Sequence, residues 1–268
     1  MMPIISIREL VVEYDGRRVL DGLNLDIEPG ETMVLLGGSG SGKSTLLRQI
    51  IGLGRPKSGS VSVKGVDVNH CSAAELKKIR HSIGVAFQSA ALFNSLSVKD
   101  NVALPLREHT RLAPSIIDLI VWMKLAVVGL ADSSNLLPQE LSGGMKKRGA
   151  VARALALDPE ILVLDEPSAG LDPIVAAELD ELILLLKQAF HMTVIVVTHE
   201  MRSAFRIADR IAMLHEGKFI SVGPKDEISA SQDLHVRHFL DRIPGHMTNA
   251  TSVAAHFEKY LHSQETRQ

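Results

Sequence analysis

The chain of 268 residues carries a formal net charge of −2 and a single cysteine, Cys71. A near-neutral charge gives no global electrostatic case for nucleic acid as the main partner, and one cysteine excludes an internal disulfide bond and favours a reducing compartment. Because the longest apolar runs are too short to cross a bilayer and Arg8 and Glu9 interrupt any N-terminal secretory signal, we expect a soluble cytoplasmic protein.

The N-terminal part of the chain has the pattern of several strands around one helix. Strands are predicted over residues 4–12, 23–27, 32–36, 60–63 and 83–87, and a helix over residues 44–51. Apolar and polar residues alternate in the first two strands, which is typical of half-exposed strands, and Asp15 and Gly16 mark a turn between them. The third strand is a continuous apolar run that is followed by glycines. This pattern is typical of a buried parallel strand that leads into a helix.

The pattern changes after Ala90 and then returns to strands. Helices are predicted over residues 114–128, 145–157 and 175–189, and strands over residues 161–164, 193–197, 211–214 and 218–222. Glu216 and Gly217 mark the turn of a final hairpin. We therefore predict an α/β core formed by residues 1–88 and 159–228, a helical insertion over 89–158, and a C-terminal extension over 229–268.

The glycine-rich stretch between the third strand and the first helix has the spacing of a phosphate-binding loop. Its glycines let successive backbone N–H groups point at phosphates, and the helix adds its positive N-terminal end. We expect ATP to be bound by Gly37, Ser39, Gly40, Ser41, Gly42, Lys43, Ser44 and Thr45. Lys43 would reach the β- and γ-phosphates and the Ser44 hydroxyl would ligate Mg²⁺. A flexible Gly/Ser loop is the alternative.

Two carboxylates, Asp165 and Glu166, end the apolar run 161–164. A buried strand at this place would deliver Asp165 beside the phosphate loop, where it would hold Mg²⁺ through water. Glu166 would face the γ-phosphate and polarise the attacking water. The alternative is an ordinary strand that happens to end in acidic residues.

The segment Leu141-Ser-Gly-Gly-Met145 resembles the signature sequence of ABC transporter ATPases, and the preceding motifs stand in the order of that family. The resemblance implies a P-loop NTPase fold with a RecA-like core, an antiparallel β subdomain and an inserted α-helical signature subdomain. It also implies a head-to-tail homodimer, in which Ser142, Gly143 and Gly144 bind the ATP of the opposite protomer. Ser142 stands at a helix N-cap position, which agrees with anion binding.

Other residues match further motifs of the same family. Tyr14 corresponds to the aromatic residue that stacks on adenine, and Gln88 to the glutamine that joins the subdomains and acts at the catalytic metal site. The segment Ser168-Ala-Gly-Leu-Asp172 corresponds to the loop that crosses the dimer, and His199 to the switch histidine that orients water with Glu166. Each of these residues has an alternative role. Tyr14 could be an ordinary aromatic residue of the strand, Gln88 a polar loop residue and His199 a structural residue.

The chain departs from the family at two positions. Met145 replaces the glutamine that most often follows the signature glycines, so a nucleotide contact through that glutamine is in doubt. Gly170 replaces the alanine that is usual in the dimer-crossing loop, which should make the loop slightly more flexible. Neither departure removes a predicted phosphate ligand.

The segments 89–94, 101–110 and 141–145 resemble the ATPase subunit of Mla-type lipid transporters, which maintain outer-membrane lipid asymmetry. That resemblance implies an inner-membrane permease, a periplasmic ring of lipid-binding MCE subunits and a small cytoplasmic STAS-domain subunit as partners. It places the chain on the cytoplasmic side of the bacterial inner membrane, with no nucleic acid partner. A groove near Gln88 and Phe93 is the expected seat of the permease's coupling helix. For residues 104–110, the alternative is a helix boundary caused by Pro105, with exposed charged residues.

The C-terminal extension carries five histidines: His235, His238, His246, His256 and His262. No cysteine accompanies them, so solvated polar histidines are the favoured interpretation, and zinc binding is the alternative. Val253, Phe257, Tyr260 and Leu261 would share one helix face. The family resemblance suggests that the extension steadies the dimer, and a disordered end is the alternative.

Two rival functions share most of the motifs. An ATPase of a polar-solute importer, for example for amino acids, would carry every catalytic motif of this chain. A soluble ABC ATPase acting on nucleic acid or ribosomes would carry two cassettes, long coiled coils or zinc-bearing insertions, and this sequence has none of these.

Overall fold

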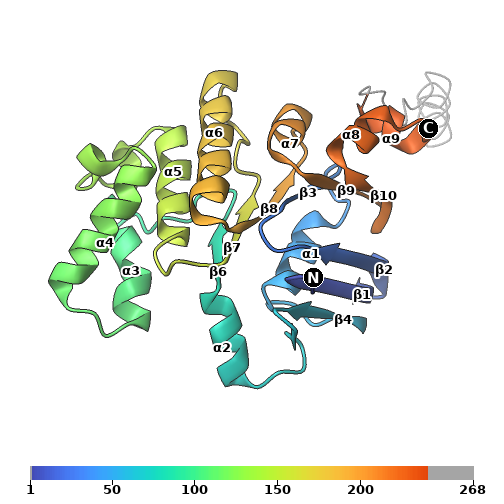
Figure 1. Cartoon of the computed structure of the whole chain (residues 1–268), viewed down its shortest axis with the longest axis horizontal. Helices are drawn as coiled ribbons and strands as arrows, with labels where there is room; N and C mark the ends of the chain where they lie inside the picture. The colour runs from blue at the N-terminus through green and yellow to red at the C-terminus, as the bar shows by residue number, and fades with distance from the viewer. Residues whose placement is uncertain (1, 241–268) are drawn as a thin grey trace, which may run out of the picture. The chain divides into compact units, whose positions relative to one another are not determined.

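The computed structural model describes residues 2–240, and the chain divides into two compact units, Met1–Ile228 and Ser229–Gln268. The first unit contains two β-sheets, the helices that cover them and a group of helices inserted after β6 (Figure 1). Within the second unit, helix α9 spans Leu234–Leu240. The predicted helix face formed by residues 253–261 lies outside the described residues.

An antiparallel sheet of four strands has the order β2-β1-β4-β5. The strands are β1 (Ile5–Tyr14), β2 (Arg17–Ile27), β4 (Ser58–Val63) and β5 (Val66–Asp67). The predicted start of the second strand at residue 23 is wrong. Asp15 and Gly16 form a two-residue turn with φ of 50° and 77°, so pairing of β1 with β2 begins at Tyr14 and Arg17. Arg17 and Arg18 at the start of β2 interrupt the alternation of apolar and polar residues, so the sequence pattern does not reveal this part of the strand.

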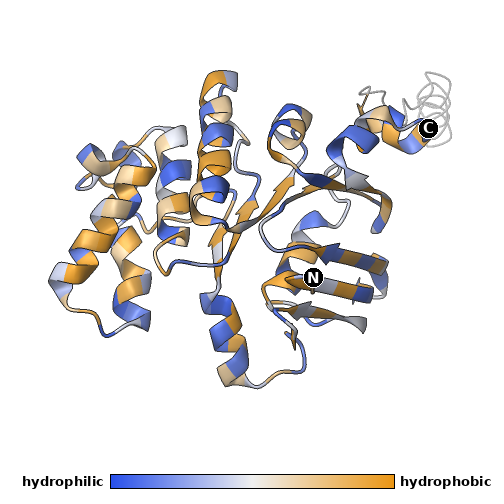
Figure 2. Cartoon of the chain, in the orientation of Figure 1, coloured by the Kyte–Doolittle hydropathy of each residue, from blue (hydrophilic) through white to orange (hydrophobic). Residues whose placement is uncertain are grey.

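The second sheet has six strands in the order β10-β9-β3-β8-β7-β6, and all neighbours are parallel except the β9–β10 hairpin. The strands are β3 (Thr32–Leu36), β6 (Ile83–Ala86), β7 (Ile161–Asp165), β8 (Thr193–Thr198), β9 (Arg210–His215) and β10 (Lys218–Pro224). Figure 2 shows hydrophobic residues along the central strands, which are covered on both faces. The carboxyl ends of β3, β8 and β7 therefore share one sheet edge.

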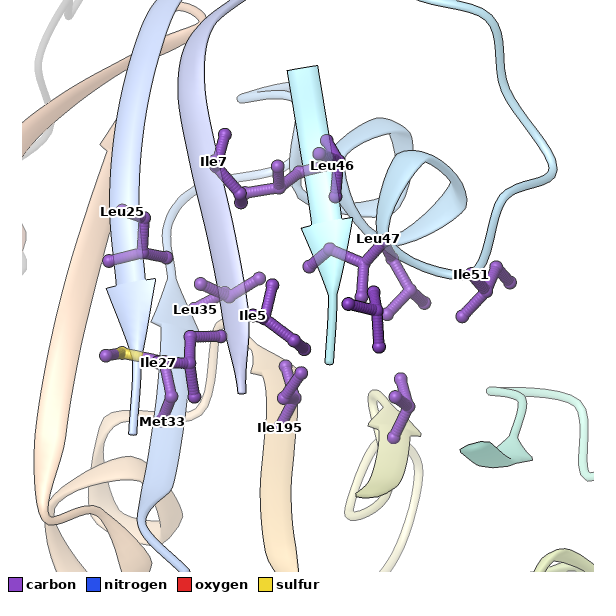
Figure 3. Packing of buried hydrophobic residues seen from close by; sticks show 14 of the residues in the cluster. Ile5, Ile7, Leu25, Ile27, Met33, Leu35, Leu46, Leu47, Ile51 and Ile195 are labelled. Atoms are coloured by element: carbon purple, nitrogen blue, oxygen red, sulfur yellow. The ribbon is translucent and has the colours of Figure 1, made fainter. Parts of the chain in front are cut away.

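Helix α1 (Lys43–Ile50) packs between the two sheets and contributes to one continuous hydrophobic core. Leu46 and Leu47 face Ile5 and Ile7 of β1 and the strand residue Leu35 (Figure 3). All five of these side chains are buried. Burial of α1 on both sides fixes where its N-terminus meets the end of β3, and that junction is the predicted phosphate loop.

Three further helices belong to the core region: α2 (Ala73–His81), α6 (Pro173–Phe190) and α7 (Met201–Ile207). Helices α6 and α7 lie on the opposite side of the six-stranded sheet from α1 (Figure 1). Helix α2 was not predicted, because it is polar and has little buried surface, although Ser72 and Glu75 form a capping box at its start. Helix α7 was also not predicted, since seven residues are too few to show helical spacing.

The insertion after β6 contains α3 (Val98–His109), α4 (Pro114–Val127) and α5 (Gly143–Ala154), together with the short 3₁₀ helices Ala131–Ser133 and Pro138–Glu140. The alternative of a helix boundary at Pro105 is wrong, because α3 continues through this proline to His109. Helix α5 begins two residues earlier than predicted, since the Ser142 side chain caps it, and ends before residue 157.

Helix α8 (Lys225–Ala230) follows β10 and crosses the boundary between the two compact units. Among residues 2–240, no helix combines the length and apolar character that a membrane span requires.

Candidate active site

The predicted phosphate loop connects the fully buried strand β3 to helix α1, as the sequence indicated. Gly40 and Gly42 have φ of 76° and 109°, a region that L side chains rarely adopt. A Cβ on Gly37 would lie 2.3 Å from the backbone oxygen of Leu214, and one on Gly42 would lie 2.6 Å from Leu20 Cδ2. Packing against backbone therefore requires glycine at 37, and the positive φ favours glycine at 42.

Lys43 is buried inside the curve of this loop. Its Nζ donates to the backbone oxygens of Gly37 at 2.7 Å and Gly38 at 2.9 Å. Burial lowers the pKa of Lys43, and the nearby carboxylates Glu166 and Asp165 oppose that shift. The ammonium group thus faces both the loop and the two acidic residues.

The remaining predicted loop residues differ in exposure. Ser39, Gly40 and Ser44 are exposed, and Thr45 is partly buried. Ser41 is buried and its Oγ has no hydrogen-bond partner among the described residues. The exposed residues form the open side of the loop, which is the side that a phosphate chain would reach.

Asp165 ends strand β7 and pairs in register with Val197 of β8. Burial raises its pKa, Glu166 raises it further, and Lys43 and Lys147 oppose the shift. Its Oδ1 is buried and has no hydrogen-bond partner in the described part of the chain. A buried, unpartnered carboxylate oxygen beside a hydroxyl-bearing phosphate loop suits a hard cation such as Mg²⁺.

Glu166 and His199 come together across the edge of the sheet. Glu166 Oε2 lies 2.9 Å from His199 Nδ1 and accepts a hydrogen bond from Thr198 Oγ1 at 3.3 Å. The Glu166 side chain is 11% exposed and that of His199 is 52% exposed, so a nearly buried carboxylate is paired with a solvent-accessible imidazole. The pair has one buried acidic group and one imidazole that can contact a ligand from solvent.

The backbone of Glu166 is strained. Its φ of 48° lies in the left-handed region, which costs a non-glycine residue roughly 1–3 kcal/mol. The Glu166 N–H donates to Val197 O at 2.8 Å, which helps to hold this conformation. The strain occurs at the residue that the sequence predicted to activate water.

The signature residues lie at the start of α5, where Ser142 Oγ accepts a hydrogen bond from Met145 N at 3.3 Å. Ser142 and Gly143 are exposed, whereas Gly144 is buried against α6, and a Cβ there would lie 2.5 Å from Val175 Cγ1. A larger residue at position 144 would therefore force the Val175 side chain to move. No hydrogen bond in the described part of the chain joins residues 142–144 to the phosphate loop.

Tyr14 and Gln88 are the remaining predicted site residues. Tyr14 is the last residue of β1 and is 46% exposed, so its ring is available for stacking. Gln88 is exposed in a turn after β6, and its backbone oxygen accepts a hydrogen bond from Lys147. The structure brings together Lys43, Glu166 and His199, and within residues 2–240 no side-chain hydrogen bond or ion pair joins Tyr14 or Gln88 to them.

Two contacts in the site were not predicted. Thr198 holds the Glu166 carboxylate, and Lys147 contacts the Glu166 backbone oxygen at 2.8 Å. Thr198 ends the apolar run of β8, where a polar residue could have been noticed. Lys147 follows the signature motif on α5, and no pattern in a single sequence marks it.

The fold and the site define a P-loop nucleotide hydrolase with an inserted helical subdomain. Residues 20–169 match the family model described as ABC transporter. The chain therefore belongs to the ABC transporter family, and the binding and hydrolysis of ATP coupled to transport follow from that membership.

Curated relatives agree over most of the chain. It is 42% identical to the protein named intermembrane phospholipid transport system ATP-binding protein MlaF from Haemophilus influenzae, over 88% of this chain and 90% of the relative. MlaF from Escherichia coli K12 is 39% identical, over 90% of this chain and 89% of the relative. The probable ribonucleotide transport ATP-binding protein mkl of Mycobacterium leprae is 43% identical over 88% of this chain and 68% of the relative.

Solved structures show the same fold. The dimeric post-hydrolysis state of the ATP-binding cassette MJ0796, bound to ADP and Pi, is similar with a TM-score of 0.76 and 32% identity, over 82% of this chain and 98% of that chain. The cbiO1 structure from Clostridium perfringens has a TM-score of 0.80 and 32% identity, over 91% and 98% of the two chains. The predicted fold class is confirmed, and the dimeric cassettes support homodimer formation.

Proposed function

We propose that this chain is the ATP-hydrolysing subunit of an ABC transporter that moves phospholipid between two membranes. The observation that carries the proposal is the match to the MlaF proteins over 88–90% of this chain and 89–90% of their length. The resemblance of segments 89–94 and 101–110 to Mla-type ATPases points the same way.

The polar-solute importer remains the second candidate, because the mycobacterial relatives are named for ribonucleotide transport. The chain spans only 66–68% of the length of those relatives. The MlaF proteins match in length as well as in sequence, so lipid transport is the better-supported function.

We assign the binding of ATP phosphates to the loop 37–45, with Lys43 on the β- and γ-phosphates and Tyr14 stacked on adenine. Lys43 already donates to two loop carbonyls, so its ammonium is held within the curve that phosphates would enter. Ser44, Gln88 and Asp165 would hold Mg²⁺, whose chemistry is to neutralise charge on the phosphates. The unpartnered Oδ1 of Asp165 supports this assignment.

Glu166 would accept a proton from the attacking water, and His199 would orient that water and contact the γ-phosphate. The 2.9 Å contact between the two side chains supports a shared role. Because His199 Nδ1 engages Glu166, contact with the γ-phosphate would be made through Nε2, which lies 3.7 Å from Glu200 Oε1.

Ser142, Gly143 and Gly144 would complete the site of the opposite protomer in a head-to-tail homodimer. Ser142 and Gly143 are exposed, which allows such a contact. Ser142→Arg should reduce ATP hydrolysis at least tenfold, since a bulky cation at the cap would block closure. ATP binding by each monomer should remain near normal. Steady-state ATPase assays and nucleotide titration check this, and unchanged hydrolysis would contradict the assignment.

Phe93 supplies the proposed contact for a permease coupling helix. The residue is 53% exposed. Its backbone is firmly held, because Phe93 N donates to Asn101 Oδ1 at 2.8 Å and Asn101 Nδ2 donates to Phe93 O at 3.1 Å. An exposed aromatic side chain on a fixed backbone suits a docking contact. Through this docking contact, movement of the helical insertion would be transmitted to the permease.

Phe93→Ala should leave ATP hydrolysis by the isolated chain within about twofold of wild type. It should lower transport by the complete complex by about tenfold, because truncation of an aromatic anchor at an interface typically costs 1–2 kcal/mol or more. Parallel ATPase and transport assays measure how much substrate is transported for each ATP hydrolysed. Leu112→Ala is a control, since Leu112 is also exposed, at 41%, but lies beyond α3. Unchanged transport by Phe93→Ala would refute the docking role.

The proposed partners are an inner-membrane permease, periplasmic MCE subunits and a small cytoplasmic STAS-domain subunit, with the chain on the cytoplasmic face. Affinity purification of the tagged chain from detergent-solubilised membranes tests the proposal. Co-purification of these subunits with bound phospholipid would support it. A different permease with a solute-binding protein would favour the importer, and recovery without any membrane protein would contradict both transport functions.

A further inference from the structure

Lys147 lies in the second turn of α5, outside every residue assigned above to nucleotide or metal. Its ammonium group contacts two backbone carbonyls from different parts of the site. Nζ donates to Gln88 O at 2.6 Å and to Glu166 O at 2.8 Å. Gln88 follows β6 and Glu166 follows β7, so one side chain of the helical insertion connects the ends of two core strands.

The Glu166 peptide needs such a contact, because its φ of 48° is unfavourable for a residue with a side chain. Its N–H is held by Val197 O at 2.8 Å. Its carbonyl accepts from Ala169 N at 3.3 Å and from Lys147 Nζ at 2.8 Å. The bond from the lysine is the shorter one and is charge-assisted, so it is the stronger restraint on this carbonyl.

Helix α5 makes a second cationic contact with the same connecting segment. Arg153 donates to Ala91 O at 2.7 Å and to Ala90 O at 3.1 Å. Ala90 and Ala91 themselves have φ of 61° and 49°. The segment after β6 is therefore shaped by α5 at two places, and within residues 2–240 only Lys147 of α5 extends the hydrogen bonding to Glu166.

We infer that Lys147 is a positioning residue that makes the conformation of Glu166 depend on the place of helix α5. When α5 lies against the ends of β6 and β7, the ammonium group holds the Glu166 peptide so that its carboxylate faces His199. When the helical insertion moves away, the two hydrogen bonds break and the strained peptide is released. This inference rests on the proposed role of Glu166, and it adds a route by which the membrane subunits control hydrolysis.

The electrostatics of the site agree with this geometry. Burial lowers the pKa of Lys147, and attraction by Glu166 and Asp165 opposes the shift. The lysine therefore also balances the negative charge of the two carboxylates, in addition to its backbone contacts.

The test is Lys147→Met in the full-length chain, purified with its membrane subunits. This change keeps the aliphatic length and removes the donor. The expected result is a kcat for ATP hydrolysis that falls roughly tenfold, as for a misplaced catalytic group, with a KM for ATP within about twofold of wild type. Lys147→Arg, which can donate to both carbonyls, should recover most of the rate. Lys99→Met is the matched control, since Lys99 is exposed on α3, and it should behave like wild type. An unchanged kcat in Lys147→Met would overturn the inference.

A double substitution shows whether Lys147 acts through Glu166. In a Glu166→Gln background, Lys147→Met should lower the residual single-turnover rate by less than about twofold, because the group that it positions is already gone. A further tenfold loss would contradict the inference. ATP-driven dimerisation should persist in the Lys147→Met single variant and in the double variant. Loss of dimerisation in both would show that Lys147 has a general structural role instead. If the Glu166→Gln variant hydrolyses ATP at a normal rate, the proposed function of Glu166 is wrong. If Glu166→Gln hydrolyses ATP slowly and Lys147→Met hydrolyses it at a normal rate, only the inference about Lys147 is wrong.

Discussion

Glu166→Gln is expected to lower the rate of ATP hydrolysis by a factor of about 10²–10³, because the amide cannot accept a proton from water. The substitution keeps the shape of the side chain, and an amide group can still pair with His199 and Thr198, whose atoms lie 2.9 and 3.3 Å from Glu166 Oε2. ATP binding should therefore be retained, and the dimer with two bound ATP molecules should accumulate because its hydrolysis is blocked.

Single-turnover hydrolysis and size-exclusion chromatography with ATP measure these two outcomes. Glu200→Gln is the matched control, because Glu200 Oε1 lies 3.7 Å from the other ring nitrogen of His199 and the substitution changes charge by the same amount. It should keep most of the activity. Near-normal turnover in Glu166→Gln would show that another group activates water.

Lys43→Ala is expected to weaken ATP binding about 10–100-fold, which corresponds to the loss of charge-assisted hydrogen bonds worth roughly 1.5–3 kcal/mol. The effect has a second source, since the loop carbonyls of Gly37 and Gly38 lose the donor that they have at 2.7 and 2.9 Å. Asp165 and Glu166 would also lose a neighbouring positive charge.

Nucleotide titration by calorimetry measures the loss of affinity, and thermal melting without nucleotide measures the change in the loop. Lys43→Met shows how much of any loss of thermal stability comes from removal of the buried aliphatic stem, because it lacks the ammonium group and keeps a stem of similar length. Both variants should bind ATP weakly, and Lys43→Met should melt closer to wild type. Normal affinity in both would remove Lys43 from the phosphate site.

The phosphate loop was predictable because its requirements are local. A buried apolar strand, glycines at 37 and 42, and a following helix all follow from a short stretch of sequence, and the structure has them in that order. The helix spans Lys43–Ile50, one residue earlier than the predicted 44–51. Likewise, the hairpin at Glu216 and Gly217 depends on two adjacent residues with positive φ.

The long-range part of the site depends on tertiary structure. The sequence placed Glu166 and His199 after two different strands, but their 2.9 Å contact requires β7 and β8 to be neighbours in register. The left-handed φ of Glu166 has no sequence signal, because nothing in its side chain favours that conformation. Lys147 looks like any helical lysine until α5 is packed against the strand ends. Pro105 shows the converse, since tertiary packing keeps a helix intact through a residue that usually ends one.

The most direct test of the proposed function uses the complete complex reconstituted into liposomes that contain a fluorescent phospholipid. Phospholipid movement between the liposomes and a lipid acceptor is followed after ATP is added. Phospholipid transport by this complex predicts ATP-dependent movement with the wild-type chain and almost none with Glu166→Gln, although both bind ATP. ATP hydrolysis by the wild-type complex without any movement of phospholipid would contradict the lipid-transport function.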